Sequence, residues 1–337
     1  MLRGACRTLA LPRIFKTLTP SMLAIHPAAL DFARAASAQS ADLFIGHTLP
    51  GLAAAAMAAQ HHGARLGFDA EDAHFLETDF ALHDPVERCA IHTIESTLLP
   101  RCLHLTAASP AIGEAYQQRY GIKLPRTVLN VFPLSMAPTG SSQRTLSEST
   151  FKMYWFSQTI GPGRGLEAIV DVACHMRPGV ILRLRGEPLA GYLGQLQDRA
   201  AGHGRAGLIE ALSPALPSEM ARLAADADLG LSVEEAEPRN RDLCLTNKIF
   251  TYLLAGIPQL MTPTRAQAAL APDLEDAALL ADINNIRDTA TLLEHFRQDH
   301  ARRINAAKTA ATLAKKYYNW DREKHELLQS VREALQN

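Results

Sequence analysis

Short apolar runs alternate with longer amphipathic segments along most of the chain. The runs have the length of β-strands, and the segments between them carry apolar residues at helical spacing. In the first part of the chain the pattern predicts strands at 41–47, 64–70, 102–108 and 126–132, and helices at 50–63, 84–100 and 109–121. Strands that alternate with helices form a parallel sheet covered on both faces. The first part therefore predicts a doubly wound α/β domain.

The same alternation restarts after a break in composition. Residues 133–150 are rich in Pro, Ser, Thr and Gly, which is typical of a linker. Beyond this segment the pattern predicts strands at 151–157, 179–186, 208–212, 228–233, 258–262 and 277–281. It predicts helices at 165–176, 191–202, 216–227 and 246–255, with Ser218 as the cap of the third. Three further helical patterns end the chain, and the last of them covers about 322–336. The chain thus predicts two Rossmann-like doubly wound domains facing a cleft, which is a favoured place for a ligand.

The predicted domain boundaries follow from these patterns. We expect an N-terminal domain, a linker, a C-terminal domain and a final helix, at residues 1–135, 136–150, 151–317 and 318–337. The first forty residues are an atypical start, because no strand followed by a Gly-rich loop occurs there.

Composition excludes several classes of protein. The 337 residues are 47% hydrophobic and 20% charged, as in an ordinary globular protein, and the net charge of −1 argues against nucleic acid as a partner. Five cysteines without C-x-x-C spacing fit reduced thiols in the cytoplasm. No run approaches the ~18–20 apolar residues that span a bilayer. The first forty residues hold five basic residues and one acid, so peripheral contact with the inner membrane face is a second expectation.

A Gly-rich turn joins the strand at 151–157 to the next helix. Gly161 and Gly163 leave room for a bound group to approach the backbone, and Arg164 follows them directly. The amides at a helix start favour an anion, and a guanidinium is well suited to phosphate. The turn therefore predicts a phosphate site. The alternative is a tight turn with a solvated arginine.

The helix at 246–255 begins with polar residues that its packing does not require. Thr246 is the expected N-cap, which places Asn247 and Lys248 in the first turn, with Thr251 on the same side. A lysine is unfavourable at the positive end of a helix unless an anion lies beside it. The alternative is that Lys248 is simply exposed. The buried stripe of this helix is expected to consist of Ile249, Phe250, Leu253 and Leu254.

A cluster of titratable residues follows the predicted strand at 64–70. Asp69, Glu71 and His74 lie near its carboxyl end, where parallel sheets place their chemistry. Histidine with carboxylates is suited to acid–base work near neutral pH. The spacing lacks the ligand pattern of a structural zinc site, so no metal is expected. The alternative is an acidic loop that opens a helix.

Several of these segments resemble the GT-B glycosyltransferases, especially the large retaining family 4. The stretch "NKIFTYLLAGIPQL" is similar to the family's NKxFEYxxAGxPxx segment, and "SQTIGPGRGLEAIV" is similar to the first turn of its C-terminal domain. The stretch "ADLFIGHTLPGLAAAAMAAQHHGARLGFDAEDAH" resembles the region beside the acceptor. The resemblance covers roughly residues 40–335.

The resemblance implies a role for each candidate residue. Arg164 and Lys248 would contact the phosphates of the donor, and substitution of Lys248 by alanine would weaken donor binding while the fold is kept. Gly161, Gly163, Asn247 and Thr251 would line the donor site, and the acceptor and reacting sugar would lie near His47, Asp69, Glu71 and His74. The final helix would cross back to the N-terminal domain.

The sequence departs from the family at the donor site. Thr251 stands where the family usually has a glutamate that holds the ribose of the donor, and residue 243, eight positions earlier, is a leucine. A hydroxyl makes a single hydrogen bond where a carboxylate can hold both hydroxyls of a diol. Glu234 or Glu235 could substitute in space. The family also normally begins with a strand and a Gly-rich loop that faces the cleft, which the first forty residues lack, so the N-terminal sheet is expected to lack its usual first strands. Either change raises the question of whether turnover has been weakened, altered or lost.

The resemblance predicts a nucleotide-sugar-dependent hexosyltransferase that retains anomeric configuration, in glycan or polysaccharide biosynthesis. Its donor would be a nucleotide diphosphate sugar, and its acceptor a glycan, a lipid-linked molecule or a small molecule, with no further cofactor. One alternative is a non-catalytic GT-B-like subunit that binds without turnover. A dehydrogenase with two Rossmann domains is the third candidate, but the sequence lacks its G-x-G-x-x-G motif.

Overall fold

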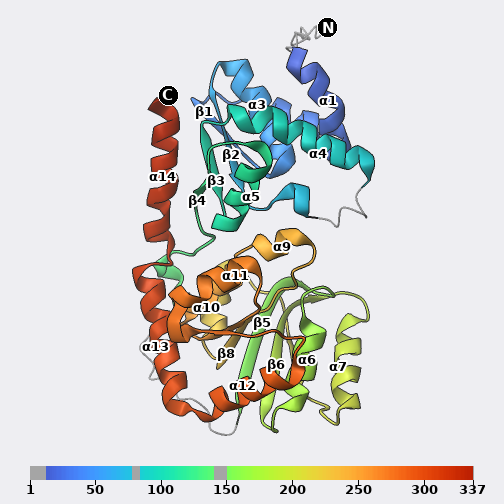
Figure 1. Cartoon of the computed structure of the whole chain (residues 1–337), viewed down its shortest axis with the longest axis vertical. Coiled ribbons are helices and arrows are strands. Elements are labelled where there is room, and N and C mark those ends of the chain that lie inside the picture. The colour runs from blue at the N-terminus through green and yellow to red at the C-terminus, as the bar shows by residue number, and fades with distance from the viewer. Residues whose placement is uncertain (1–12, 78–83, 140–149, 337) are drawn as a thin grey trace, which may run out of the picture. The chain divides into compact units, whose positions relative to one another are not determined.

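The computed structural model (Figure 1) describes residues 13–77, 84–139 and 150–336, with side chains from residue 18 onward. The chain divides into two compact units. The first unit extends to Thr127 and also contains the chain from Leu327 onward, and the second unit is Val128–Glu326. Most of the predicted linker, residues 140–149, lies outside the described residues. None of the helices in the described ranges is long and apolar enough to cross a membrane.

The first unit is built on a parallel sheet with the strand order β1-β2-β3-β4. The elements in chain order are α1 (Arg13–Ile25), α2 (Ala29–Ser37), β1 (Leu43–His47), α3 (Thr48–His62), β2 (Arg65–Ala70), α4 (Pro85–Leu98), β3 (His104–Ala107), α5 (Pro110–Tyr120) and β4 (Arg126–Thr127). From residue 13 onward no described strand precedes β1, as the atypical start predicts. The strand predicted at 126–132 is shorter than expected, with two residues.

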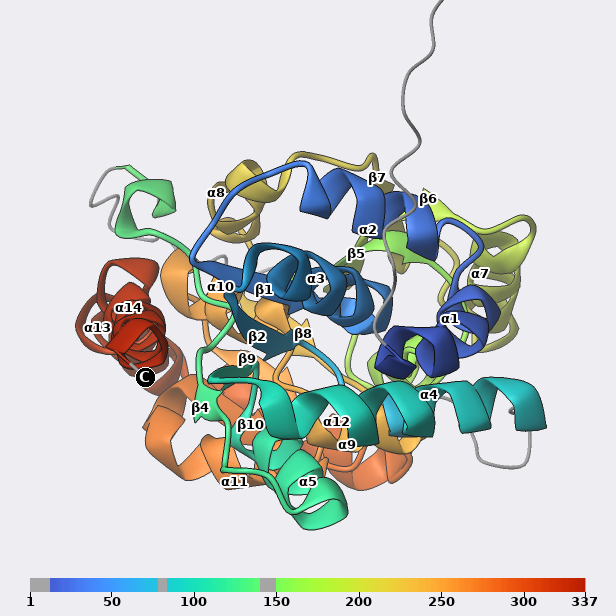
Figure 2. The same cartoon turned by 90° about the horizontal axis from the view of Figure 1, so that it is seen from above.

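Local signals set the boundaries of these helices. The side chain of Ser109 accepts a hydrogen bond from the amide of Ile112 at the start of α5, and Gly121 ends the helix with a φ of 63°. Figure 2 shows α3 lying across β1 and β2. The helix approaches so closely that a Cβ atom added to Gly46 would lie 2.5 Å from the backbone of Leu52. Only glycine permits this approach.

The second unit has a parallel sheet of six strands in the order β10-β9-β8-β5-β6-β7. Its strands are β5 (Phe151–Ile160), β6 (Val180–Pro188), β7 (Ile209–Leu212), β8 (Leu229–Ser232), β9 (Gln259–Met261) and β10 (Ala278–Leu280). Its helices are α6 (Leu166–His175), α7 (Tyr192–Gly202), α8 (Met220–Ala224), α9 (Arg239–Leu243), α10 (Asn247–Ala255), α11 (Arg265–Leu270), α12 (Ile286–Gln298), α13 (His300–Lys316) and α14 (Trp320–Gln336), the last of which continues into the first unit.

Side chains of β5 alternate between two cores, so both faces of this sheet are covered. Met153 and Trp155 pack with α6, α7 and α12 on one face. Tyr154 and Phe156 pack with α8 and α10 on the other. Alternation of this kind follows from the two-residue period of a strand. The doubly wound architecture predicted from the sequence is therefore confirmed.

Three details of the second unit differ from the sequence prediction. Ser218 caps no helix, because a 3₁₀ turn over Pro217–Glu219 precedes the short helix α8. Thr246 occupies the N-cap position of α10, but its buried hydroxyl makes no hydrogen bond to the helix. The helices α9 and α11 were not predicted, since five and six residues are too few to show an apolar period.

Candidate functional site

Three polar side chains of the first unit form a row across neighbouring strands. The strand register places His47 opposite Asp69, and Asp69 opposite Thr106. Nδ1 of His47 lies 3.0 Å from one carboxylate oxygen of Asp69, and the Thr106 hydroxyl donates to the other at 2.6 Å. Because His47 ends β1, and Asp69 and Thr106 are each one residue from the end of their parallel strands, the row lies at the carboxyl edge of the sheet, where such folds bind ligands.

The surroundings of His47 and Asp69 in this row shift the pKa values of both side chains from their ordinary values. The hydrogen bond with Asp69 raises the pKa of His47 above 6.5. Burial acts to raise the pKa of Asp69, but hydrogen bonds from His47 and Thr106 outweigh it and lower that pKa. The side chain of His47 is 60% exposed, so its ring can reach a ligand. Thr48, which follows it, has a φ of 61°, an unfavourable conformation for a residue other than glycine that is often found at functional sites.

Glu71 joins this row, whereas His74 does not. Ligand atoms of His47, Asp69 and Glu71 all lie within 4.8 Å of one another, a spacing that would also suit a metal ion. His74 is buried, with Nδ1 at 2.5 Å from Glu77 and its amide donating to the Tyr116 hydroxyl. Burial acts to lower the pKa of His74, but the hydrogen bond with Glu77 raises it. The structure therefore brings together three of the four predicted residues.

In the second unit, the Gly-rich turn leads from β5 into α6 as predicted. Gly163 and Gly165 have φ values of 70° and 68°, which favour glycine, and Gly165 is the N-cap of α6. Its amide donates to a carboxylate oxygen of Glu235 at 3.2 Å. The guanidinium of Arg241 donates to the carbonyl oxygen of Gly163. Sequence reasoning missed Arg241, which comes from the short helix α9, and the only available signal was its charge.

Arg164 and Lys248, predicted as two phosphate contacts, converge on one internal carboxylate. Nζ of Lys248 lies 2.6 Å from Oε1 of Glu234, and Nη1 of Arg164 lies 3.7 Å from Oε2. The side chains of Lys248 and Glu234 are 6% and 1% exposed, whereas that of Arg164 is 36% exposed. Arg164 is therefore the cation that a ligand can reach directly. The alternative interpretation, a simply exposed Lys248, is wrong, because α10 is buried nearly all round.

The other predicted donor residues lie on α10 and in the turn. Asn247 is exposed at the start of the helix, and Thr251 is buried. The hydroxyl of Thr251 donates to the carbonyl oxygen of Asn247 at 2.9 Å, within the helix itself. A Cβ atom added to Gly161 would lie 2.6 Å from the side chain of Leu189. Because Thr251 is buried and its hydroxyl is engaged within its own helix, this residue does not hold a ligand as a carboxylate would.

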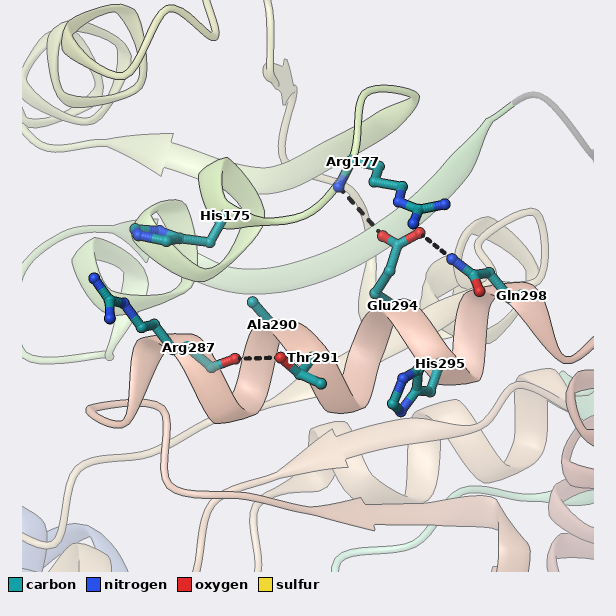
Figure 3. A pocket seen from close by; sticks show the side chains of 8 residues that line it. All are labelled: His175, Arg177, Arg287, Ala290, Thr291, Glu294, His295 and Gln298. Carbon is teal, nitrogen blue, oxygen red and sulfur yellow. Dashed lines mark hydrogen bonds between the residues drawn. The ribbon is translucent and has the colours of Figure 1, made fainter.

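A pocket in the second unit lies elsewhere. It has a volume of about 440 Å³ and lies between the end of α6 and one face of α12. Figure 3 shows the residues that line it. His175, the last residue of α6, forms one side, and Glu294 of α12 accepts hydrogen bonds from the amide of Arg177 and from Gln298. The Gly-rich turn precedes the first residue of α6, so the pocket is at the opposite end of that helix.

Comparison with known proteins identifies the fold. No protein-family model matches the sequence, and no curated protein matches it either. Among solved structures, HepE from Anabaena in complex with UDP and glucose is 17% identical, with a TM-score of 0.73 over 93% of this chain and 83% of that one. HepE in complex with UDP-glucose is similar to the same degree, with a TM-score of 0.74.

Two further structures agree. Sucrose-phosphate synthase from Thermosynechococcus elongatus is 13% identical, with a TM-score of 0.73 over 92% of this chain and 78% of that one. A glycosyltransferase from Rickettsia africae is 10% identical, with a TM-score of 0.69 over 100% of this chain and 84% of that one. The chain therefore has the GT-B glycosyltransferase fold, as the resemblance of its sequence predicts.

Proposed function

We propose that the chain is a glycosyltransferase that moves a hexose from a nucleotide diphosphate sugar to an acceptor hydroxyl, with retention of anomeric configuration, in glycan or polysaccharide biosynthesis. One observation carries the proposal. A Gly-rich turn with the half-exposed Arg164 lies at the carboxyl edge of the second sheet, in a fold that HepE shares, and HepE is known in complex with UDP-glucose.

The second unit binds the donor in this proposal. Arg164 and the amides at the start of α6 stabilise the diphosphate as it leaves, because fixed positive charge is the main catalytic contribution in such reactions. Gly161 and Gly163 let the diphosphate approach the backbone. Asn247, which is exposed at the start of α10, lines the donor side, whereas Thr251 is buried and keeps its hydroxyl on the carbonyl oxygen of Asn247. Lys248 contributes through Glu234, because its ammonium group is buried against that carboxylate.

The first unit activates the acceptor. Asp69 holds Nδ1–H of His47, which leaves Nε2 to accept a proton. The acceptor oxygen forms a bond to the anomeric carbon, the bond from that carbon to the diphosphate oxygen breaks, and the diphosphate leaves with the electron pair. The proton of the acceptor hydroxyl passes to Nε2. Glu71 lies beside this pair and can bind hydroxyls, and His74 supports the loop from inside.

The acceptor and cellular setting form the broader part of the proposal. A glycan, a lipid-linked molecule or a small molecule would serve as acceptor, in the cytoplasm and without a metal ion. Peripheral membrane contact through α1 and α2 is supported by the exposed side chains of Leu23 and Phe32, which are 44% and 43% exposed. The basic start of the sequence would favour an anionic surface.

A second candidate function is a GT-B-like subunit that binds its ligand without turnover. Thr251 and Leu243 stand where the resemblance expects carboxylates, and Lys248 already has an internal counterion. This candidate predicts donor binding without transfer.

Two measurements separate the candidates. A thermal-shift screen of the purified chain against UDP-, GDP- and ADP-sugars identifies the donor, because a ligand that binds only the folded state raises the melting temperature. A radiolabelled-sugar transfer assay with mixed acceptors then measures turnover, and NMR of the product gives its anomeric configuration. Binding with neither transfer nor donor hydrolysis would support the subunit. The absence of any shift would overturn both candidates.

A further inference from the structure

Glu234 occupies a rigid position at the carboxyl edge of the second sheet. It lies two residues after the end of β8. The Thr262 hydroxyl accepts a hydrogen bond from the amide of Glu234 at 2.9 Å and donates to its carbonyl oxygen at 2.8 Å. Thr262 follows β9, the neighbour of β8, and is itself buried. The backbone that carries the carboxylate is thus fixed by the sheet, which favours a precise ligand contact.

The two oxygens of this carboxylate have different surroundings. Oε1 accepts a hydrogen bond from Nζ of Lys248 at 2.6 Å. Oε2 is buried and, within the described residues, receives no hydrogen bond. Nη1 of Arg164 lies 3.7 Å from it, too far for a hydrogen bond. A buried carboxylate oxygen without a donor is costly, which favours a ligand that brings an O–H or N–H group to Oε2.

We propose that Oε2 of Glu234 accepts a hydrogen bond from a hydroxyl group of the nucleotide sugar, which rests on the function proposed above. The diphosphate offers only acceptors, and the hydroxyls of the ribose and of the sugar ring are the donors that flank it on its two sides, so one of these supplies the hydrogen. Arg164, the exposed member of the cluster, moves onto the diphosphate and opens the way to Oε2. Lys248 is a positioning residue that holds the carboxylate of Glu234 in place through its 2.6 Å contact with Oε1.

Glu234 thereby supplies a carboxylate that α10 lacks. Thr251 lies three residues after Lys248 on this helix, and its hydroxyl is already engaged with Asn247. The carboxylate therefore reaches the cluster from β8 instead of from the helix. This arrangement makes hydroxyl recognition depend on one acidic residue and its lysine partner.

Calorimetric titration of ligand and protein variants tests the proposal. The wild-type chain and Glu234→Gln are titrated with UDP, its 2′-deoxy and 3′-deoxy forms, UDP-glucose and UDP-glucose deoxygenated at each sugar carbon in turn. Loss of a hydrogen bond to a charged group weakens binding by about 10- to 100-fold. One deoxy ligand should show this loss with the wild type, and Glu234→Gln should abolish the difference. A ribose analogue with that behaviour identifies the ribose as the source, and a sugar analogue identifies the ring.

Controls separate binding from folding. Glu219→Gln alters an exposed carboxylate of the same unit and should keep the wild-type pattern. If Glu234→Gln does not fold, the double variant Glu234→Gln with Lys248→Met is used in its place, because it removes both buried charges together. If Glu234→Gln weakens the binding of every ligand equally, or leaves the difference between the deoxy ligand and its parent unchanged, the role of Glu234 is overturned while nucleotide binding stands. A wild-type chain that binds no nucleotide sugar would overturn the proposed function itself.

Discussion

Substitution of Lys248 by alanine should destabilise the second unit strongly. Its ammonium group lies 2.6 Å from Glu234, and both side chains are almost fully buried. Removal of one partner of such a pair leaves an uncompensated buried charge, at a cost of about 3–5 kcal/mol. A domain of 150–250 residues loses about 2–4 °C in Tm per kcal/mol, so the expected fall is roughly 6–20 °C. The sequence alone suggested an unchanged fold, because it could not show that this lysine is buried.

Tryptophan fluorescence during thermal unfolding is the appropriate assay. The two tryptophans of the chain, Trp155 and Trp320, both lie in the second unit, and Nζ of Lys248 is 5.9 Å from the centre of the Trp155 ring. The double variant Lys248→Met with Glu234→Gln is the matched comparison and should recover most of the loss, since neither charge remains. A Tm for Lys248→Ala within 2 °C of the wild type, roughly the effect of a weak surface pair, would refute the reasoning.

The remaining predictions concern Arg164 and Thr251 of the second unit and the row of His47 and Asp69 in the first. Arg164→Ala should raise the donor Kd by about tenfold or more with little change in Tm, because this side chain is partly exposed and makes only a 3.7 Å ion pair; an unchanged Kd by calorimetry would remove Arg164 from the site. His47 must be neutral to accept a proton, and its pKa is raised above 6.5. Turnover should therefore fall as the pH is lowered through this pKa, which gives the pH–rate profile an acid limb above pH 6.5. In Asp69→Asn the hydrogen bond that raises this pKa is weakened, so the limb should move to lower pH, and a pH–rate profile that stays in place would contradict the role of the pair. Turnover should survive EDTA; inactivation reversed by a divalent ion would instead show that a metal occupies the cluster around His47. Thr251→Glu should lower Tm without strengthening donor binding, because it places a carboxylate at a position that is almost fully buried.

The alternation of strands and helices could be predicted from the sequence because its signals are local. Ser109 caps its own helix, and Gly121 ends it through a left-handed conformation that the residue itself favours. The apolar runs of β5 and β8 are buried on both faces, and such runs are visible without knowledge of their partners. The fold class and the turn that carries Arg164 therefore followed from short stretches of sequence.

Contacts between distant parts of the chain required the tertiary structure. The row of His47, Asp69 and Thr106 depends on the register of three strands, and a shift of one residue would turn each side chain to the other face. His74 lies only three residues from Glu71, yet a 3₁₀ turn places it in the interior. No local pattern encodes either outcome.

The same limit applies to the cluster of Arg164, Glu234 and Lys248. Lys248 and Glu234 come from different elements, and their sequence positions gave no sign of an ion pair. Apolar periodicity indicates which side of a helix is buried, but it cannot show that a charged residue is buried too, because that depends on whether a counterion arrives from another strand. The sequence by itself determined the scaffold and several candidate side chains. The packing of β8, β9 and α10 decided which of these charges a ligand can reach.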